Sequence, residues 1–351
     1  MKTLLVDIGS TLLERTVPGP FTRVAATLSG HGVELSAYAE RMRLARCLLS
    51  GHARDAAADA AAEEFALTPA AAAAVRRSLD VPEGDPIILP GAVELVRSAV
   101  GAGWRIVAAT NAAAWSEPLP EPLHESISAT LSSADLGVLK QDAEFWRKAR
   151  TEQGIDERTA LVVGDNPVAD QETPEAAGFC AVVHGPGRPT LQEIAAWLRQ
   201  AAAEPEEPLA LVAGRPVRWA GQHVLAVPHR HDLVASVTRR RVCAHLGRRP
   251  VTTTIVRRRD LAPALILPGP VPDGGLVWTS PIGERRIPHI PEDLRQVLIE
   301  RGLSIDGLNG LETRHLISMV REARDRDVRR QRIENIVEFL LKSRETVENG
   351  A

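Results

Sequence analysis

Four short segments of the chain carry side chains that could act together on a phosphoryl group. The first runs from Asp7 to Thr11, and the others are Thr110-Asn111, Lys140, and the run from Gly164 to Asp170. A carboxylate can attack phosphorus when a divalent cation offsets its repulsion from an anionic substrate. Asp165 and Asp170 offer the oxygen ligands that Mg²⁺ prefers. Together these groups predict Mg²⁺-dependent phosphoryl chemistry that begins at Asp7.

The remaining groups of these segments suit binding and charge compensation. Thr110 and the backbone N–H groups after Asp7 could donate hydrogen bonds to phosphoryl oxygens, and Lys140 could offset charge on nucleophile and phosphate together. Lysine is scarce, so its presence here is informative: the chain has Lys2, Lys140, Lys148 and Lys342. Taken alone, a strand-end Asp is commonly a turn former, and a Thr-Asn pair commonly caps a helix. The prediction therefore depends on the combination.

Apolar runs place each segment beside an expected strand or helix. Strands are predicted over 3–7, 104–110, 160–165 and 181–184, and helices over 91–102, 142–153, 174–178 and 190–203. Strands that alternate with helices at this spacing form a parallel sheet covered on both faces. Ligands bind at the carboxyl ends of such strands. An alanine-rich segment, about residues 16–86, is predicted to be a helical insertion over the loop after the first strand.

This ordered set resembles the haloacid dehalogenase (HAD) superfamily of hydrolases. That superfamily has a strand-end Asp with a downstream Thr, a Thr or Ser, a Lys, and a GDxxxxD run, and all four occur across about residues 1–200. The helical insertion is similar to its C1 cap. The resemblance implies an α/β, Rossmann-like fold and bound Mg²⁺. It implies catalytic roles for Asp7, Thr110 and Lys140, substrate binding by Ser10, Thr11 and Asn111, and metal ligation by Asp7, Gly9, Asp165 and Asp170.

One position departs from the phosphatases of that superfamily. They carry a second Asp two residues after the nucleophile, which protonates the leaving group, and this chain has Gly9 there. General acid–base help is worth about 10²–10⁴-fold, so turnover is expected to be attenuated. Glu14 could replace the acid or could simply be solvated. Phosphonoacetaldehyde hydrolases also lack the second Asp, but they need a cap lysine, and residues 16–86 have none. Haloacid dehalogenases usually replace the acidic GD that this chain keeps.

The composition is that of a globular protein with room for two or three domains. The chain has 351 residues, of which 44% are hydrophobic and 25% charged, which excludes disordered and disulfide-stapled classes. An aromatic share of 3% disfavours a base-stacking nucleic-acid platform. No long uncharged apolar run and no signal-peptide layout occur, which predicts a cytoplasmic protein without membrane contact. The three cysteines lack the spacing of a disulfide framework or a zinc site.

The two halves of the chain differ in charge. Residues 1–208 hold 18 basic and 29 acidic side chains, whereas residues 209–351 hold 24 and 16. After a HAD-like domain over 1–203 and a charged linker at 204–208, short apolar bursts over 209–290 predict a small Arg-rich β-domain, either a barrel or a sandwich. Its arginines, which cluster within 209–286, could dock the acidic half or neutralise nucleic-acid phosphates. Arg41, Arg43, Arg46 and His52 in the insertion could meet a second anionic group or form a solvated face.

Residues 291–351 return to helical periodicity, with helices predicted over 291–301 and 311–343. Glu322-Ala-Arg324 and the run from Arg329 to Val337 resemble the C-terminal helices of the YdeI/OmpD-associated family, although Ser318 stands where an aromatic is usual there. This resemblance implies architecture and no particular activity.

The function predicted for the chain is a Mg²⁺-dependent HAD-type phosphatase that acts on a small phosphorylated metabolite through an aspartyl-phosphate at Asp7. The alternative is a non-catalytic HAD-like binding or scaffold protein whose Arg-rich module binds an acidic partner or nucleic acid.

Overall fold

The structure, a computed structural model, describes most of the chain. The described residues are 1–49, 53–114, 116, 119–121, 123–201, 205, 208–227, 230, 233, 239–246, 249–257, 263–267, 269, 274–281, 290–305, 310–323 and 325–349. They form two compact units, Met1–Pro281 and Ile282–Ala351. Residues 204, 206 and 207 of the predicted linker lie outside the described residues. The predicted division of residues 1–290 into two domains stays a prediction.

A five-stranded parallel sheet forms the centre of the first unit. Its strands lie in the order β5 (Ala129–Ser132), β4 (Arg105–Thr110), β1 (Thr3–Val6), β6 (Ala160–Gly164) and β7 (Cys180–Val183). In register, Leu4 of β1 faces Ile106 of β4 and Leu161 of β6. The expected α/β, Rossmann-like fold is confirmed. The edge strand β5 was not among the predicted strands.

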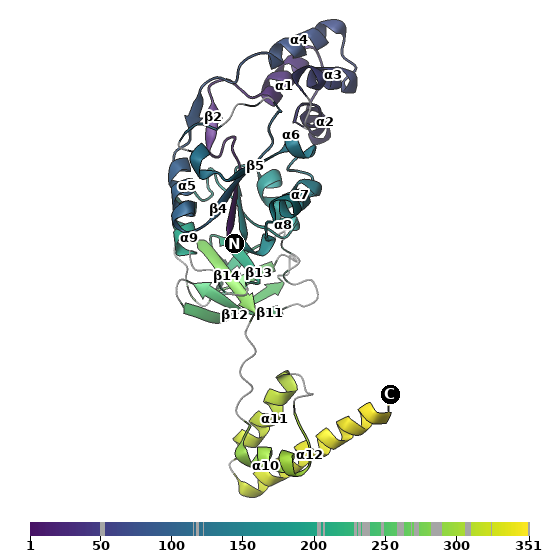
Figure 1. Cartoon of the computed structure of the whole chain (residues 1–351), viewed down its shortest axis with the longest axis vertical. Helices are drawn as coiled ribbons and strands as arrows, with labels where there is room; N and C mark the ends of the chain where they lie inside the picture. Colours follow the sequence, from purple (N-terminus) through teal and green to yellow (C-terminus); the bar gives the residue numbers. More distant parts are fainter. Residues whose placement is uncertain are drawn as a thin grey trace. The chain divides into compact units, whose positions relative to one another are not determined.

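Helices cover both faces of this sheet, as Figure 1 shows. Leu4 and Val6 pack in one core with α5 (Ala92–Gly101) and α9 (Leu191–Gln200), whereas Leu5 packs in a second core with α7 (Ala143–Gln153). Successive strand residues point to opposite faces, so an unbroken apolar run serves both cores. The helix α8 (Thr173–Ala176) lies on the α7 side. The short helices α6 (Ser133–Leu136) and η3 (Val168–Glu172) follow β5 and β6.

The predicted insertion forms four helices above the carboxyl ends of the strands. They are α1 (Pro20–Gly30), α2 (Tyr38–Leu49), α3 (Arg54–Glu64) and α4 (Pro69–Leu79), and they share a core of leucine, valine and alanine side chains. A two-stranded antiparallel ribbon, β2 (Leu13–Arg15) and β3 (Pro86–Ile88), joins this insertion to the sheet. The ribbon was not predicted, because three-residue strands leave no readable periodicity.

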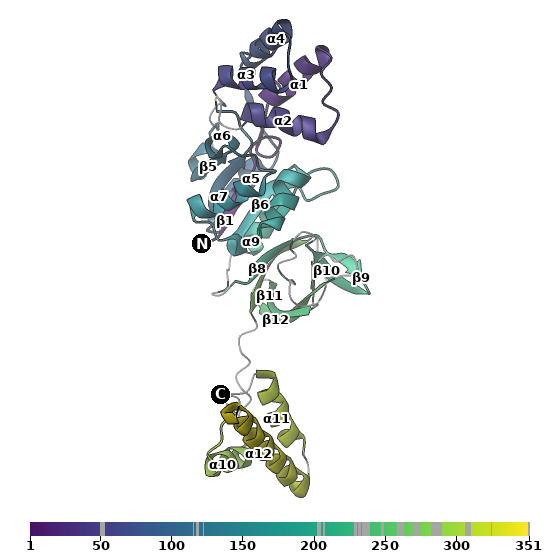
Figure 2. The same cartoon turned by 90° about the vertical axis from the view of Figure 1, so that its right-hand side faces the viewer.

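The remainder of the first unit is one seven-stranded antiparallel sheet, which curves around its own core in Figure 2. The strands lie in the order β8 (Ala210–Gly214), β14 (Gly275–Pro281), β11 (Arg239–Leu246), β12 (Arg249–Arg257), β13 (Pro263–Ile266), β10 (Gln222–Ala226) and β9 (Val217–Trp219). The apolar bursts predicted five of these strands. The strand β11 was missed because three consecutive arginines open it.

A tryptophan pair joins the curved sheet to the parallel sheet. Trp278 of β14 stacks on Trp104, which precedes β4, with ring centroids 6.1 Å apart. The Trp278 ring N–H donates to the Ala201 carbonyl at 3.1 Å, and both rings are buried. Leu211 of β8 belongs to the same core as Leu4. The attachment therefore lies at the amino ends of β1 and β4.

The second unit contains α10 (Glu292–Glu300), α11 (Gly310–Glu322) and α12 (Arg326–Asn349), packed around a leucine and isoleucine core. The single helix predicted over 311–343 is wrong, because α11 ends at Glu322 and a second helix, α12, begins at Arg326. Asp325 causes the new start, since its Oδ1 accepts the N–H groups of Asp327 and Val328 at 2.9 and 3.0 Å. Among the helices that the structure describes, none combines the length and apolarity needed to cross a bilayer.

Candidate active site

Asp7 occupies the first position after β1, at the centre of the sheet. Its N–H donates to the Val163 carbonyl of β6 at 2.9 Å, which extends the ladder by one residue and fixes the side chain at the strand end. The side chain is 11% exposed. The carboxylate is therefore mostly buried and fixed in position at the end of the strand.

Lys140 reaches Asp7 from the loop before α7. Its Nζ donates to Asp7 Oδ1 at 2.6 Å and lies 2.5 Å from Asp170 Oδ1, with 3% of the side chain exposed. Two hydrogen bonds hold its backbone: its N–H donates to Asn111 Oδ1 at 2.9 Å, and its carbonyl accepts from the Trp146 ring N–H at 2.8 Å. The ammonium is thus positioned between two carboxylates by groups from β4 and α7.

Asn111 does more for Lys140 than the sequence indicated. Besides accepting from the Lys140 N–H, its Nδ2 donates to Gln141 Oε1 at 2.8 Å. Both ends of the amide therefore hold the Lys140 loop. Substrate binding by Asn111 stays a prediction.

Asp165 and Asp170 complete the group after β6. Asp165 is exposed, whereas Asp170 on η3 is buried and its Oδ2 accepts the Asn166 N–H at 3.0 Å. A Cβ on Gly164 would lie 2.2 Å from the Asp170 carboxyl carbon, so the glycine is needed for this close approach. Both Asp170 oxygens have protein partners, which fits a supporting role beside Asp7 and Asp165.

The charges of this cluster shift one another's protonation. Burial raises the pKa of Asp7 to about 7, with Lys140 opposing the rise and the charges of Asp170 and Asp165 adding to it. Burial and Asp170 likewise raise the pKa of Asp165. Burial alone would lower the pKa of Lys140, but Asp7 and Asp170 raise it, so the lysine stays charged. The cluster therefore contains three carboxyl groups and one ammonium, which pairs with Asp7 and Asp170, so carboxyl groups outnumber positive charges.

The three carboxylates suit a hard divalent cation. One oxygen from each of Asp7, Asp165 and Asp170 lies within 4.8 Å of the other two. Oxygen donors at this density, short of positive charge, match the preference of Mg²⁺ for one or two carboxylates with water and phosphate completing the shell. The three predicted carboxylates are therefore brought together, and ligation by Gly9 stays a prediction.

A cavity of about 440 Å³ lies between the carboxyl ends of β1 and β4 and the helical insertion. Ile8, next to Asp7 in the chain, lines it, whereas the three carboxylates and Lys140 do not. Gly9, Thr110 and Asn111 line it at the carboxyl ends of β1 and β4. A Cβ on Gly9 would meet no heavy atom within 4 Å. Leu13 and Arg15 of β2 also line the cavity, whereas Glu14 between them is exposed and does not. Strand alternation turns Glu14 away, which disfavours it as a substitute acid.

Ser10 and Thr11 shape the loop after Asp7. Ser10 has a φ of 58°, and its N–H donates to the Leu13 carbonyl at 2.9 Å. Thr11 is fully buried, and its Oγ1 lies 3.2 Å from His184 Nε2. His184 directly follows β7 and was not predicted as a site residue, because its position at a strand end was the only signal. Phosphoryl binding by Ser10 and Thr11 stays a prediction.

The arginines of the insertion serve surface contacts. Arg43 pairs with Glu64 at 3.0 Å, Arg46 pairs with Asp142 at 3.1 Å, and Arg41 lies over the Phe21 ring. His52 lies outside the described residues. Of the clustered arginines in 209–286, Arg241 is exposed on β11, and Arg248, Arg258 and Arg259 lie outside the described residues. Nucleic-acid binding through this region stays a prediction.

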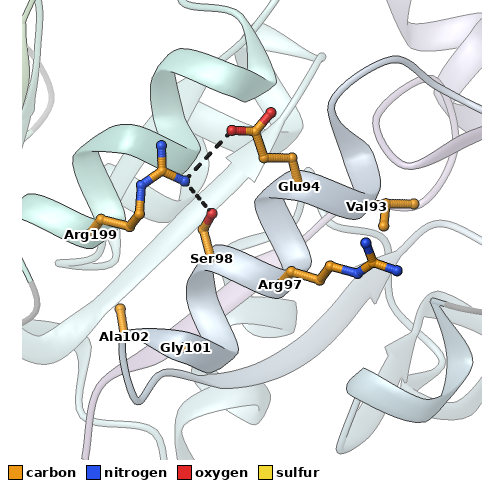
Figure 3. Close-up of a pocket in the computed structure, with 7 residues that line it drawn as sticks. All are labelled: Val93, Glu94, Arg97, Ser98, Gly101, Ala102 and Arg199. Carbon is orange, nitrogen blue, oxygen red and sulfur yellow. Dashed lines mark hydrogen bonds and ion pairs between the residues drawn. The ribbon is translucent and has the colours of Figure 1, made fainter.

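A second hollow, of about 680 Å³, lies between α5 and α9 (Figure 3). Arg199 of α9 crosses it, donating to Ser98 Oγ at 2.5 Å and pairing with Glu94 at 3.6 Å. These contacts tie the two helices together. The residues that line the hollow come from α5, the residue after it, and α9, and none of them lies at the carboxyl end of a strand, so the hollow is separate from the site at Asp7.

Comparison with protein families gives one match, and it covers half of the chain. The sequence profile described as "Hydrolase: haloacid dehalogenase-like hydrolase" matches residues 1–178, which include Asp7, Thr110, Lys140, Asp165 and Asp170. Among curated proteins no relative was found.

Solved structures that match part of this chain include a 2-haloacid dehalogenase from Pseudomonas syringae pv. Tomato DC3000. It is 19% identical, with 54% of this chain and 89% of that chain covered and a TM-score of 0.37. A HAD family enzyme from Bacteroides thetaiotaomicron, solved with magnesium and inorganic phosphate, is 13% identical over 54% and 96% of the two chains, with a TM-score of 0.37. A predicted phosphoglycolate phosphatase from Haemophilus somnus is 15% identical over 52% and 84%, with a TM-score of 0.35.

Proposed function

The chain belongs to the haloacid dehalogenase-like hydrolase family, and from this premise we propose that it is a Mg²⁺-dependent phosphatase of small phosphorylated metabolites. The observation that carries the proposal is the cluster of Asp7, Asp165 and Asp170 around Lys140. Three carboxylates have oxygens within 4.8 Å of one another, and the Lys140 ammonium pairs with two of them, Asp7 and Asp170. A metal-independent site would leave this excess negative charge opposed to an anionic substrate.

Asp7 is the nucleophile of the proposed reaction. Its carboxylate attacks the phosphorus of a phosphomonoester, the bond to the leaving-group oxygen breaks, and an aspartyl-phosphate forms on Asp7. Water then attacks this acyl phosphate, which releases inorganic phosphate and restores the carboxylate. Because burial raises the pKa of Asp7 to about 7, added positive charge beside the nucleophile would favour its ionised form at neutral pH.

The other residues hold charge and position. Asp7, the Gly9 carbonyl and Asp165 would hold Mg²⁺, with Asp170 supporting, and the bound ion would supply charge compensation for nucleophile and phosphoryl oxygens. Lys140 neutralises charge on Asp7, and the Thr110 hydroxyl donates to a phosphoryl oxygen from the wall of the cavity. Asn111 and Trp146 fix the lysine backbone.

The leaving group receives no proton from position 9. Gly9 lines the cavity and carries no side chain, and Glu14 does not line it. Turnover is therefore expected to favour substrates whose leaving-group oxygen is a weak base, such as aryl phosphates and acyl phosphates. The four-helix insertion acts in this proposal as a C1 cap that encloses the leaving group.

Phosphate release from a panel of phosphoesters in the presence of Mg²⁺ tests the proposal. Wild type is compared with Asp7→Asn, which preserves shape and removes the nucleophile, and with Asp55→Asn, which makes the same change on the exposed surface of α3. We expect Asp7→Asn to abolish release and Asp55→Asn to leave it unchanged. Release that survives in Asp7→Asn, or its absence from wild type on every ester, would contradict the proposed function.

Two finer assignments accompany the proposal. The Arg-rich curved sheet and the helices α10 to α12 govern the choice of partner or place in the cell, and they take no part in the reaction. The resemblance of helices α11 and α12 to the C-terminal helices of the YdeI/OmpD-associated family concerns architecture and implies no particular activity.

A further inference from the structure

The loop that follows Asp7 is wound around one carbonyl group. The Ile8 carbonyl accepts the N–H groups of Leu12 and Leu13 at 2.9 and 3.0 Å. No hydrogen bond in the described part of the chain uses the N–H groups of Ile8 and Gly9. These two donors come directly after the nucleophile, so they are available to phosphoryl oxygens as long as the loop keeps this shape.

The loop needs contacts from outside to keep its shape. Ser10 has a φ of 58°, a left-handed conformation that costs conformational energy in any residue with a side chain. Such a residue persists where the structure around it holds the chain in place. Thr11, the next residue, is fully buried, and a buried hydroxyl needs a hydrogen-bond partner. The shape of the loop therefore depends on what the Thr11 hydroxyl contacts.

His184 supplies this contact from the end of β7. Its Nε2 lies 3.2 Å from Thr11 Oγ1, and among the described residues no other group hydrogen-bonds this hydroxyl. The His184 N–H donates to the Gly164 carbonyl at 2.9 Å, so the backbone of His184 is fixed to the end of β6. A hydroxyl can both donate and accept, so either neutral tautomer of the ring can make the bond to Thr11.

The His184 ring also lies near the carboxylates that follow β6. Burial lowers the pKa of His184, and the charges of Asp165 and Asp170 oppose this effect. One half-buried side chain thus connects the loop after Asp7 with the segment that carries two of the three carboxylates.

From these contacts we infer, on the basis of the proposed phosphatase function, that His184 is a positioning residue of the reaction. It holds Thr11, and through Thr11 it keeps the N–H groups of Ile8 and Gly9 where a transferring phosphoryl group needs them. The imidazole does not line the cavity, and it transfers no proton in this role. Because the loop is ordered before the substrate binds, no binding energy is spent on ordering it.

Substitution of His184 tests the inference through steady-state kinetics on p-nitrophenyl phosphate with Mg²⁺. His184→Phe keeps an aromatic ring and removes its nitrogens. We expect kcat to fall by about tenfold to a hundredfold, because a misplacement of about 1 Å can cost about 10²-fold. KM should change by less than about threefold, since hydrogen bonds to phosphoryl oxygens strengthen mainly as charge develops in the transition state.

A conservative variant separates the hydrogen bond from the ring. The amide of His184→Gln can reach Thr11 and can donate or accept, so this variant should recover most of the lost kcat. An equal loss in His184→Gln and His184→Phe would overturn the role of the hydrogen bond.

Thr11→Val removes the same contact from its other end, and it tests the inference even where His184→Phe does not fold. It keeps the shape of the side chain without the hydroxyl and should lower kcat as His184→Phe does. The double variant His184→Phe/Thr11→Val should lose no more than the larger single loss, because both changes remove one contact. A double loss equal to the product of the single losses would show that the two residues act independently, against the inference.

His245→Phe is the matched control. His245 Nε2 lies 2.9 Å from Ser280 Oγ in the curved sheet, so this variant removes the same kind of contact away from Asp7. Calorimetry compares its loss of thermal stability with that of His184→Phe, and its kcat should stay at the wild-type value. An active wild type whose kcat is unchanged in His184→Phe or in Thr11→Val overturns the positioning role alone. Absence of Asp7-dependent phosphate release from wild type overturns the proposed function with it.

Discussion

Gly9 is the residue at which this site departs most from a complete phosphatase. A Cβ at this position meets no heavy atom within 4 Å, and the Gly9 φ is not in the left-handed region, so the backbone accepts other residues. Glycine is therefore not required here by sterics. An acid placed at Gly9 would lie on the wall of the cavity beside Thr110.

We expect Gly9→Asp to raise kcat, because it supplies a proton to the leaving group. The gain should be at least about tenfold, largest for alkyl phosphates, and should not exceed the upper end of the 10²–10⁴-fold that general acids provide. Steady-state phosphate release on an alkyl and an aryl phosphate measures it. Gly9→Asn has the same shape without the acid and should give no gain; equal gains in both variants would argue against proton donation.

The pKa of Asp7 predicts an unusual stability difference in Mg²⁺-free protein. A carboxyl whose pKa rises from 3.8 to about 7 on folding stabilises the fold fully below pH 3.8, and that contribution is lost as the pH rises through 7. Asp7→Asn should therefore melt at a higher temperature than wild type at pH 8, with the difference shrinking toward pH 4. Calorimetry with and without Mg²⁺ measures this, and Mg²⁺ should stabilise wild type more than the variant. A variant that melts lower at pH 8 would show that the Lys140 pair outweighs burial.

At the scale of elements, the end of β6 is constrained by the buried carboxylate that follows it. Asp170 packs directly on Gly164, so a methyl group at that position must displace the carboxylate or the strand end. Gly164→Ala is expected to cost about 1–3 kcal/mol in the free energy of unfolding and to weaken Mg²⁺ binding. Chemical denaturation and metal titration measure the two effects. Gly101→Ala, where a Cβ meets nothing within 4 Å, is the matched control and should leave metal binding unchanged.

The central strands could be predicted because a strand that is buried on both faces consists mostly of apolar residues. β1, β4, β6 and β7 contain mostly apolar residues, and the segments after β1 and β6 contain the three carboxylates. Lys140 precedes α7 instead, and its scarcity in the chain was the signal that identified it. The strand β11 could not be predicted because it begins with three arginines. The start of α12 could not be predicted because it depends on a local cap by the Asp325 side chain.

The cavity was beyond prediction for a different reason. Arg15 and Glu83 are 68 positions apart in the chain and meet only because β2 and β3 pair across the base of the insertion. His184 contacts Thr11 only because the residue after β7 and the loop after β1 lie at the same edge of the sheet, where the strands have their carboxyl ends. The sequence pattern identifies residues that follow neighbouring strands. It does not show which residues come into contact where the chain enters and leaves a long insertion.

At the scale of the whole molecule, the first unit depends on the contact between Trp104 and Trp278. Both rings are buried, and the core around them joins residues of the parallel sheet, α9 and the curved sheet. Trp278→Ala should cost about 3–5 kcal/mol in the free energy of unfolding, because it removes a large buried ring and the hydrogen bond to Ala201.

Trp219→Ala is the control for that variant, since Trp219 is only half-buried on the edge strand β9 and should cost less. Scanning calorimetry of the full chain measures both. A Trp278→Ala protein that melts as wild type would show that the two sheets are energetically independent.

The tryptophan contact lies at the amino ends of β1 and β4, whereas Asp7, Thr110 and Gly9 lie at the carboxyl ends of the same strands. The parallel sheet thus has a reacting edge and an anchoring edge, separated by the length of its strands. Substitutions that remodel the appended sheet can accumulate without disturbing the geometry around the nucleophile. The appended sheet at the amino ends of the strands could therefore be exchanged, in evolution or by design, while the residues at the carboxyl ends stay in place.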